Sequence, residues 1–215
     1  MLNPLYQTSA RWYYLNLKPI TGESASLLKN CWKNVPKVLN PQETPVLSLD
    51  LETSSLDPNN GEIISAGWVV IENGEVQLGT AKHLLVSAKS SVGRSATIHN
   101  IRDCELQDGI SHEQLLIEIL KAVDSKALLF HNAHLDMAFL NQLSMEYCQA
   151  PLLLPYFDSL QIEKNKLLKT ADVLPQNSLT LSSCRHRYHL PRYPGHNALV
   201  DALATAELFI AQHQQ

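Results

Sequence analysis

Two strand-like runs, residues 63–72 and 75–86, meet at Asn73-Gly74, and this pair constrains the fold more than any other feature of the chain. Asn-Gly between apolar runs favours a β-hairpin, because both residues tolerate the positive φ that a two-residue turn needs. A third run, VLSLDLE at residues 46–52, alternates apolar and polar residues. The sheet is therefore expected to begin with its hairpin strands.

After residue 110 the pattern changes to strand followed by helix. Ser111, with Glu113 and Gln114 behind it, predicts the start of a helix. The run KALLFH at 126–131 predicts a short buried strand that leads into a helix over 132–147. Further helices are expected at 158–168, at 178–188 with Ser178 as the cap, and at 197–213. Together these elements predict an α/β layer fold.

The composition excludes several classes of protein. A chain of 215 residues, 45% apolar and 18% charged, is sufficient for one buried domain with an appendage. Its net charge of −4 argues against a protein that coats nucleic acid through a broadly basic surface. Four cysteines without a CxxC pair indicate neither a zinc ribbon nor a disulfide framework, and no secretory signal or membrane span is visible. We therefore expect a cytoplasmic protein without a membrane partner.

Residues 1–44 precede the expected main domain at 45–215 and differ from it. They carry five basic and two acidic residues, together with aromatic residues that include Trp12, Tyr13, Tyr14 and Trp32. We expect one or two helices packed on the main domain, because exposing so many aromatic rings would be costly. An arm that binds a partner is the alternative.

The strand at 46–52 places two acids on one face. Its period of two puts Asp50 and Glu52 on the side of Val46 and Ser48, and the three leucines on the other side. Two carboxylates about 7 Å apart at the backbone can reach one shared cation. Without a cation or a proton between them they would repel each other. Ordinary surface acids on a solvent-facing strand are the alternative.

A third acid, Asp136, lies in an apolar helical stripe. At helical spacing it shares a face with Phe139, Leu140 and Leu143, so its carboxylate is aimed at the protein body. A metal would compensate that charge. A first-turn acid favoured by the helix dipole after an Asn132 cap is the alternative.

A fourth acid, Asp201, repeats this arrangement in the last helix, where it shares a face with Asn197, Ala204 and Leu208. Five residues before it, His196 lies in a Pro-Gly loop, a place that suits a group able to take a proton near neutral pH. A loop histidine with only local contacts is the alternative.

Three motifs follow one another along the chain: D-x-E in the first strand, H-N-A-x-x-D at a strand-to-helix step, and H-x4-D opening the last helix. In order and spacing they resemble the DEDDh (DnaQ-like) exonucleases, the group that includes proofreading subunits of bacterial DNA polymerase III. The resemblance covers roughly residues 45–213. It implies a ribonuclease H-like fold with a mixed central sheet flanked by helices, two divalent ions, and hydrolysis from a 3′ end.

The resemblance also implies roles for the motif residues. Asp50 would contact both metal ions, Glu52 and Asp201 would complete the shell of the first ion, and Asp136 would hold the second. His196 would be the general base. Ligands that offer only oxygen favour magnesium or manganese over zinc.

Four further residues would contact the terminal nucleotide if the resemblance holds. Thr53 and Leu56 match the family's E-T-T-G-L pattern, but Ser54-Ser55 replaces its Thr-Gly. Leu135 stands where phenylalanine often precedes the second-motif aspartate. IHNI at 98–101 is similar to the family's V-H-G-I, with His99 as a sugar or base contact.

These features predict a metal-dependent 3′–5′ exonuclease that releases nucleoside 5′-monophosphates from single-stranded DNA ends. An exoribonuclease of the oligoribonuclease or RNase T type is the closest alternative, because the same acids can cut either polymer. A polymerase-associated module that binds nucleic acid without catalysis is the other. A DNA polymerase or another replication or repair protein is the candidate partner for residues 1–44.

Two weaker patterns remain. Cys184, His186 and His189 have the residue types of a zinc site, although an ordinary helix end is favoured. Between Lys164 and Arg192, six basic residues accompany one acid, Asp172. They predict either a patch that guides phosphates or a solvated helix surface.

Overall fold

The computed structural model describes residues 4–18, 20–34, 36, 38–87 and 108–214, with side chains from Thr8 onward. The IHNI segment and its His99 therefore lie outside the described residues. Within these ranges no helix is long and apolar enough to cross a lipid bilayer.

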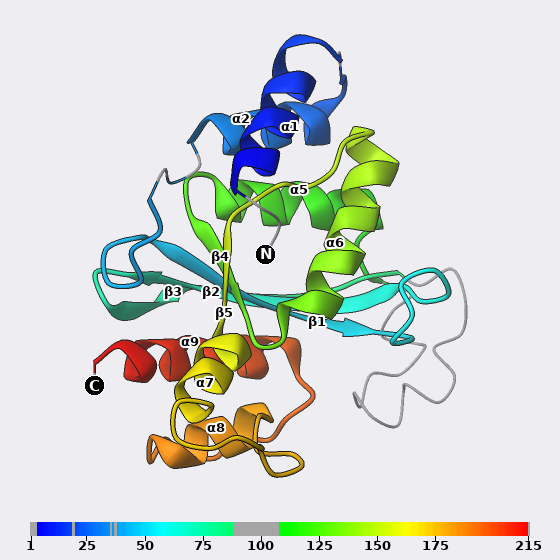
Figure 1. Ribbon diagram of the computed structural model, residues 1–215. Helices are drawn as coiled ribbons and strands as arrows, with labels where there is room; N and C mark the ends of the chain where they lie inside the picture. The colour runs from blue at the N-terminus through cyan, green and yellow to red at the C-terminus, as the bar shows by residue number, and fades with distance from the viewer. Residues whose placement is uncertain (1–3, 19, 35, 37, 88–107, 215) are drawn as a thin grey trace.

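A mixed five-stranded sheet forms the centre of the described structure (Figure 1). Its strands are β1 (Val46–Thr53), β2 (Ile63–Glu72), β3 (Glu75–Leu85), β4 (Ala127–Phe130) and β5 (Tyr156–Asp158), in the order β3-β2-β1-β4-β5. β1, β2 and β3 pair antiparallel, whereas β4 pairs parallel with β1 and β5. The predicted α/β architecture with a mixed sheet is confirmed.

The hairpin turn between β2 and β3 has the predicted geometry. Asn73 has a φ of 54° and Gly74 a φ of 75°, and Glu72 pairs with Glu75 across the two-residue turn. Two consecutive positive φ values match the twist of the flanking strands.

Helices cover both faces of the sheet (Figure 1). One side carries α1 (Pro4–Asn16), α2 (Glu23–Asn34), α5 (His112–Val123) and α6 (Ala133–Cys148); the other carries α7 (Ser159–Leu167), α8 (Leu181–Arg187) and α9 (Ala198–His213). Alternate side chains of β1 pack against these two layers of helices. Leu47, Leu49 and Leu51 join the core that includes α2, α5 and α6, whereas Val46 packs in a second cluster with Phe209 of α9.

The acid-bearing face of β1 is therefore covered by α9, not open to solvent. The hydroxyl of Ser48 is buried and donates to the carbonyl of Ala202 on α9, at 2.7 Å. This contact holds α9 against β1 two residues before Asp50.

Helix α2 shares the main core. Leu28, Cys31 and Trp32 are buried in the same cluster as the leucines of β1, and the Trp32 indole donates to the carbonyl of Leu152 at 2.7 Å. By contrast, α1 leaves the side chains of Trp12 and Tyr13 exposed.

One predicted helix cap is wrong, and the Asn132 cap named in the alternative interpretation of Asp136 has the right position but makes no side-chain bond. Helix α8 is capped by Thr180, whose hydroxyl accepts the Ser183 N–H, and not by Ser178. Asn132 occupies the cap position of α6, but its φ of 70° turns the backbone left-handed and its side chain makes no capping bond. The carboxylate of Asp158 instead accepts the N–H groups of Asn132 and Ala133, at 3.0 and 3.2 Å.

Candidate active site

Three acids from two distant segments meet at the end of β1. Asp50 and Glu52 come from β1, and Asp201 comes from the first turn of α9. One carboxylate oxygen from each lies within 4.8 Å of the others. We call these three residues the carboxylate cluster.

Gly67 on β2 allows this meeting. It lies directly opposite Asp50 in the sheet register. A Cβ at Gly67 would lie only 2.1 Å from the backbone nitrogen of Leu199 and 2.3 Å from the carbonyl carbon of Ala198. The first turn of α9 can therefore approach the sheet beside Asp50 only because this position has no side chain. Sequence reasoning missed Gly67, although a lone glycine inside a strand signals close backbone approach.

Asp136 lies beside the cluster and is anchored to β1. Pairing of β1 with β4 ends at Ser48 and Leu129, and beyond it the N–H of Leu51 donates to Asp136 Oδ1 at 3.2 Å. The carboxylate of Asp136 is close enough to raise the pKa of Asp50. The predicted stripe is also present, because Phe139 and Leu140 of the same helix face are buried.

Burial and mutual repulsion dominate the electrostatics of the four acids. Burial, followed by Asp136, Glu52 and Asp201, raises the pKa of Asp50 well above its ordinary value. Burial and the neighbouring carboxylates of Asp201 and Asp136 raise the pKa of Glu52 to about 7. Burial first of all raises the pKa of Asp136 to about 7 and also raises that of Asp201. Such a set of oxygen donors fits a divalent cation, which would relieve the repulsion.

His196 is attached to the cluster through its backbone. It adopts a left-handed conformation with a φ of 66°, and its N–H donates to Asp201 Oδ2 at 2.8 Å. The contact orders the end of the loop just where α9 begins. The ring of His196 is exposed and lines the same pocket as Asp50 and Asp201.

A buried arginine supports the loop that carries His196. The guanidinium of Arg185 donates to the carbonyls of Ala204 on α9 and Pro191 in the loop, at 2.6 and 2.9 Å, and to Glu207 at 2.7 Å. Tyr193 stacks on it, with its ring centre 4.6 Å from the guanidinium carbon, and its hydroxyl donates to Glu207 at 2.9 Å. Arg185 and Glu207 thereby tie the loop to α9. No motif or periodicity in the sequence predicts this pairing.

Two of the four acids and His196 border a pocket of about 540 Å³, which we call the site pocket. Asp50, Asp201 and His196 line it, and the exposed Arg192 lies at its edge.

The predicted nucleotide contacts are not gathered in the site pocket. Thr53 is buried and its hydroxyl donates to the carbonyl of Ser55 at 2.9 Å, within the turn after β1. Leu56 in the same turn is 82% exposed. Leu135 is partly buried against the main core. Their contacts with a nucleotide remain a prediction.

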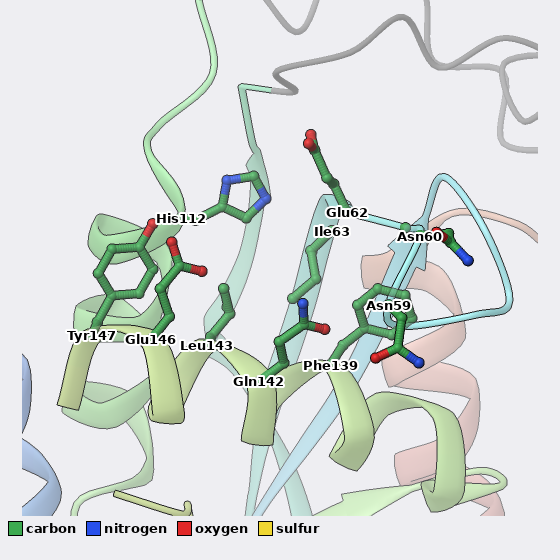
Figure 2. Close-up of a pocket in the computed structure, with 11 residues that line it drawn as sticks. Asn59, Asn60, Glu62, Ile63, His112, Phe139, Gln142, Leu143, Glu146 and Tyr147 are labelled. Atoms are coloured by element: carbon green, nitrogen blue, oxygen red, sulfur yellow. The ribbon is translucent and has the colours of Figure 1, made fainter. Parts of the chain in front are cut away.

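A separate pocket of about 280 Å³ lies between α6, the start of α5 and residues 59–63 (Figure 2). Among the described residues, Glu62 and Glu146 contribute carboxylates to its lining, and His112 is the one basic side chain there. Two carboxylates disfavour a phosphate group, because like charges repel.

The weaker patterns have structural explanations. Cys184 is buried against Tyr188 and Leu208, whereas His186 and His189 are exposed, and no metal-ligand group among the described residues includes them. In the basic stretch, Arg185 pairs with Glu207 and Arg187 with Glu163, so two of the six charges are neutralised inside the fold.

Residues 47–209 match the family model described as exonuclease, of the RNase T type. The DNA polymerase III PolC-type protein of Thermotoga petrophila is 29% identical over 198 residues, which are 90% of this chain but only 14% of that protein. The DNA polymerase III subunit epsilon of Rickettsia prowazekii is 27% identical over 168 residues, 76% of this chain and 71% of that one.

Solved structures show the same fold. The structure of E. coli exonuclease I in complex with a dT13 oligonucleotide superposes with a TM-score of 0.65 at 15% identity, over 78% of this chain and 40% of that one. The family match spans most of the chain and includes every element that supplies an acid to the site. The chain therefore belongs to the RNase T-type exonuclease family, in agreement with the resemblance to the DEDDh exonucleases.

Proposed function

We propose that this protein is a metal-dependent 3′–5′ exonuclease that removes nucleoside 5′-monophosphates from single-stranded DNA. The observation that carries the proposal is the carboxylate cluster. Asp50, Glu52 and Asp201 converge from segments about 150 residues apart, with Asp136 beside them and His196 on the same pocket. A fold that only binds nucleic acid has no need to bury acids against one another, because their repulsion costs stability.

The residues have distinct roles in this proposal. Asp50 would contribute to both of two Mg²⁺ or Mn²⁺ sites, with Glu52 and Asp201 in the first and Asp136 in the second. When bound, such a pair of ions stabilises the attacking and leaving oxygens of a phosphodiester displacement and acidifies water. The all-oxygen donor set of the cluster supports a hard divalent ion.

His196 would accept the proton of the attacking water. Its ring borders the site pocket, and its backbone is fixed to Asp201. An imidazole titrates close to neutral pH, where a general base is most effective.

The terminal nucleotide would sit at the turn after β1. Leu56 has an exposed apolar side chain there, suited to packing on a base. Thr53 is the last residue of β1, and Leu135 lies in the first turn of α6. His99 would complete these contacts. A terminal base must leave its partner to enter such a pocket, and this requirement favours a single strand.

DNA is proposed as the substrate because the named relatives are DNA polymerase III proteins. We further propose the division into an extension at 1–44 and an exonuclease domain at 45–215, with the exposed Trp12 and Tyr13 of α1 available to a replication or repair partner. Cys31, Cys148 and Cys184 are buried free thiols, which suit a reducing, cytoplasmic location.

A product analysis tests the proposal. Matched DNA and RNA oligonucleotides, labelled at the 5′ or the 3′ end, are incubated with Mg²⁺ or with EDTA. We expect immediate release of labelled mononucleotide from 3′-labelled DNA, a ladder of shortened products from 5′-labelled DNA, and no cleavage in EDTA. The Asp50→Asn variant, purified identically, controls for contaminating nucleases. Faster cleavage of RNA would assign the protein to the exoribonucleases, and mononucleotide release from the 5′ end would contradict the polarity.

A further inference from the structure

A second hollow adjoins the site pocket. It has a volume of about 770 Å³ and lies between the start of α6, helix α7 and the segment before α8. His131 and Thr180 line both this hollow and the site pocket, so the two adjoin at these residues. We call it the side groove; besides these two residues its lining includes Lys164, Leu168, Val173 and Leu174.

The side groove is held rigidly to the strand that leads into the site. The ring of His131, which follows β4, donates from Nε2 to the carbonyl of Leu179 at 2.9 Å, since a carbonyl can only accept. Its Nδ1 lies 2.8 Å from the hydroxyl of Ser159, the first residue of α7. One histidine thus connects the end of β4, the start of α7 and the segment before α8.

The lining combines apolar and cationic character. Val173 is 82% exposed and Leu168 is 44% exposed, which is unusual for aliphatic side chains that gather beside a pocket. Lys164 adds a positive charge, and Asp172 is the acid in the lining. Exposed apolar groups beside a lysine suit a ligand with flat apolar faces and negative charges.

The distribution of basic residues supports binding of an extended polyanion. Arg185 and Arg187 are committed to Glu207 and Glu163 inside the fold. Two exposed cations of the stretch remain beside the hollows, Lys164 at the side groove and Arg192 at the site pocket. One exposed cation at each of two adjoining hollows suits a strand that carries a phosphate at every nucleotide.

We propose that the side groove binds the nucleotides on the 5′ side of the scissile phosphate. Their bases pack on Leu168, Val173 and Leu174, and a backbone phosphate lies near Lys164. The proposal rests on the proposed exonuclease function, because it takes the site pocket as the place of cleavage. It implies that affinity grows with substrate length until the groove is filled.

Binding and cleavage together test the groove. Dye-labelled single-stranded DNA of about two, four, eight and twelve nucleotides is titrated in EDTA by fluorescence anisotropy. Michaelis constants are then measured with Mg²⁺ on the same lengths. The variants are Lys164→Met, which removes one charge at similar length, and Val173→Ser, at an exposed position. Lys33→Met, on the exposed surface of α2 across the sheet, is the matched control.

We expect Lys164→Met and Val173→Ser each to weaken binding of the longer strands by about 3- to 10-fold and to weaken binding of the dinucleotide least, because it places a single nucleotide on the 5′ side of the scissile phosphate. Lys164→Met should also reduce the slope of log affinity against log salt by about 0.7, the value for one lost contact to a single strand. Lys33→Met should bind like the wild type. Equal affinity of wild type and Lys164→Met for the longest strand would overturn the groove proposal.

The two proposals fail separately. Anisotropy in EDTA reports on the groove whether or not the protein cleaves DNA. A nitrophenyl ester of thymidine 5′-monophosphate, too small to enter the groove, reports on the site pocket alone. Hydrolysis of the ester without length-dependent binding would refute the groove and retain the exonuclease. Length-dependent binding without hydrolysis of ester or oligonucleotide would refute the exonuclease and retain the groove.

Discussion

Two groups of acidic side chains lie near α9, and the protein compensates one of them far more fully than the other. Glu163 and Glu207, which we call the paired acids, each meet an arginine. Glu163 is only 2% exposed, and burial alone would raise its pKa, but hydrogen bonds from Arg187, Gln212 and Tyr188 lower the pKa below its ordinary value. Here the fold supplies its own positive charge.

The carboxylate cluster is compensated far less by the part of the chain that the structure describes. Burial and the adjacent carboxylates raise the pKa of Asp50 and Glu52. The His196 N–H and the charge of Arg185 offset only part of the rise in the pKa of Asp201, and Arg185 is itself paired with Glu207. The contrast shows that this fold can neutralise a buried acid where stability requires it. The weaker compensation of the cluster leaves its oxygens suited to a cation from solution.

The largest expected effect is the loss of activity in Asp50→Asn. We expect exonuclease activity to fall by about 10³-fold or more, because the amide removes a charge at the centre of the cluster. The thermal midpoint of the metal-free variant should rise by a few degrees, because one source of repulsion is gone. Activity assays and thermal denaturation in EDTA measure both. Full activity, or a clearly lower midpoint, would contradict the assignment of Asp50.

The next effect concerns His196, whose loop joins the two groups of acids. We expect His196→Ala to lose about 10²-fold in rate near pH 7 and to recover part of it near pH 9, where more hydroxide is present and less help from a base is needed. A pH–rate profile of wild type and variant measures this. A variant profile parallel to that of the wild type would exclude His196 as the base.

Gly67→Ala should cost about 10²-fold in activity, because the added Cβ forces the first turn of α9, with Asp201, away from β1. Gly79→Ala on β3 is the matched control, since a Cβ there meets nothing within 4 Å. Affinity for Mn²⁺ should fall with the rate in Gly67→Ala. Equal activity of the two variants would show that the approach of α9 is not what assembles the cluster.

The paired acids should behave in the opposite way. Glu163→Ala leaves Arg187 and the Tyr188 hydroxyl without their partner, so we expect a loss of about 3 kcal/mol in the free energy of unfolding. Activity at low temperature should change little. Glu72→Ala, at an exposed position at the end of β2, is the control in urea denaturation. Similar stability of the two variants would contradict the claim that the arginine partners of the paired acids stabilise the fold.

The fold and the meeting of the acids were predictable because they depend on local periodicity and on motifs. Alternation in β1 placed Asp50 and Glu52 on one face, and Asn73-Gly74 set the hairpin. What could not be predicted depends on contacts between distant segments. Asp158, not Asn132, caps the start of α6 from 25 residues away, and the three residues of β5 are too few to show a period.

The supporting contacts of the site were hidden for the same reason. The basic stretch suggested free positive charge, but the partners of Arg185 and Arg187, Glu207 and Glu163, lie outside that stretch and are brought in by α9 and α7. A glycine inside a strand, such as Gly67, indicates that another backbone segment approaches closely. Only the structure identifies that segment as the first turn of α9.

The most direct test of the central claim is the thermal midpoint as a function of pH, with and without divalent cation. Glu52 and Asp136 have folded pKa values of about 7, above those of the unfolded chain. Their contribution to stability is therefore present below about pH 4 and is lost as the pH rises through about 7. We expect the midpoint in EDTA to fall between about pH 4 and 7, and saturating Mg²⁺ or Mn²⁺ to abolish that fall. Identical curves with and without the cation would contradict the claim that the cluster is built to hold metal.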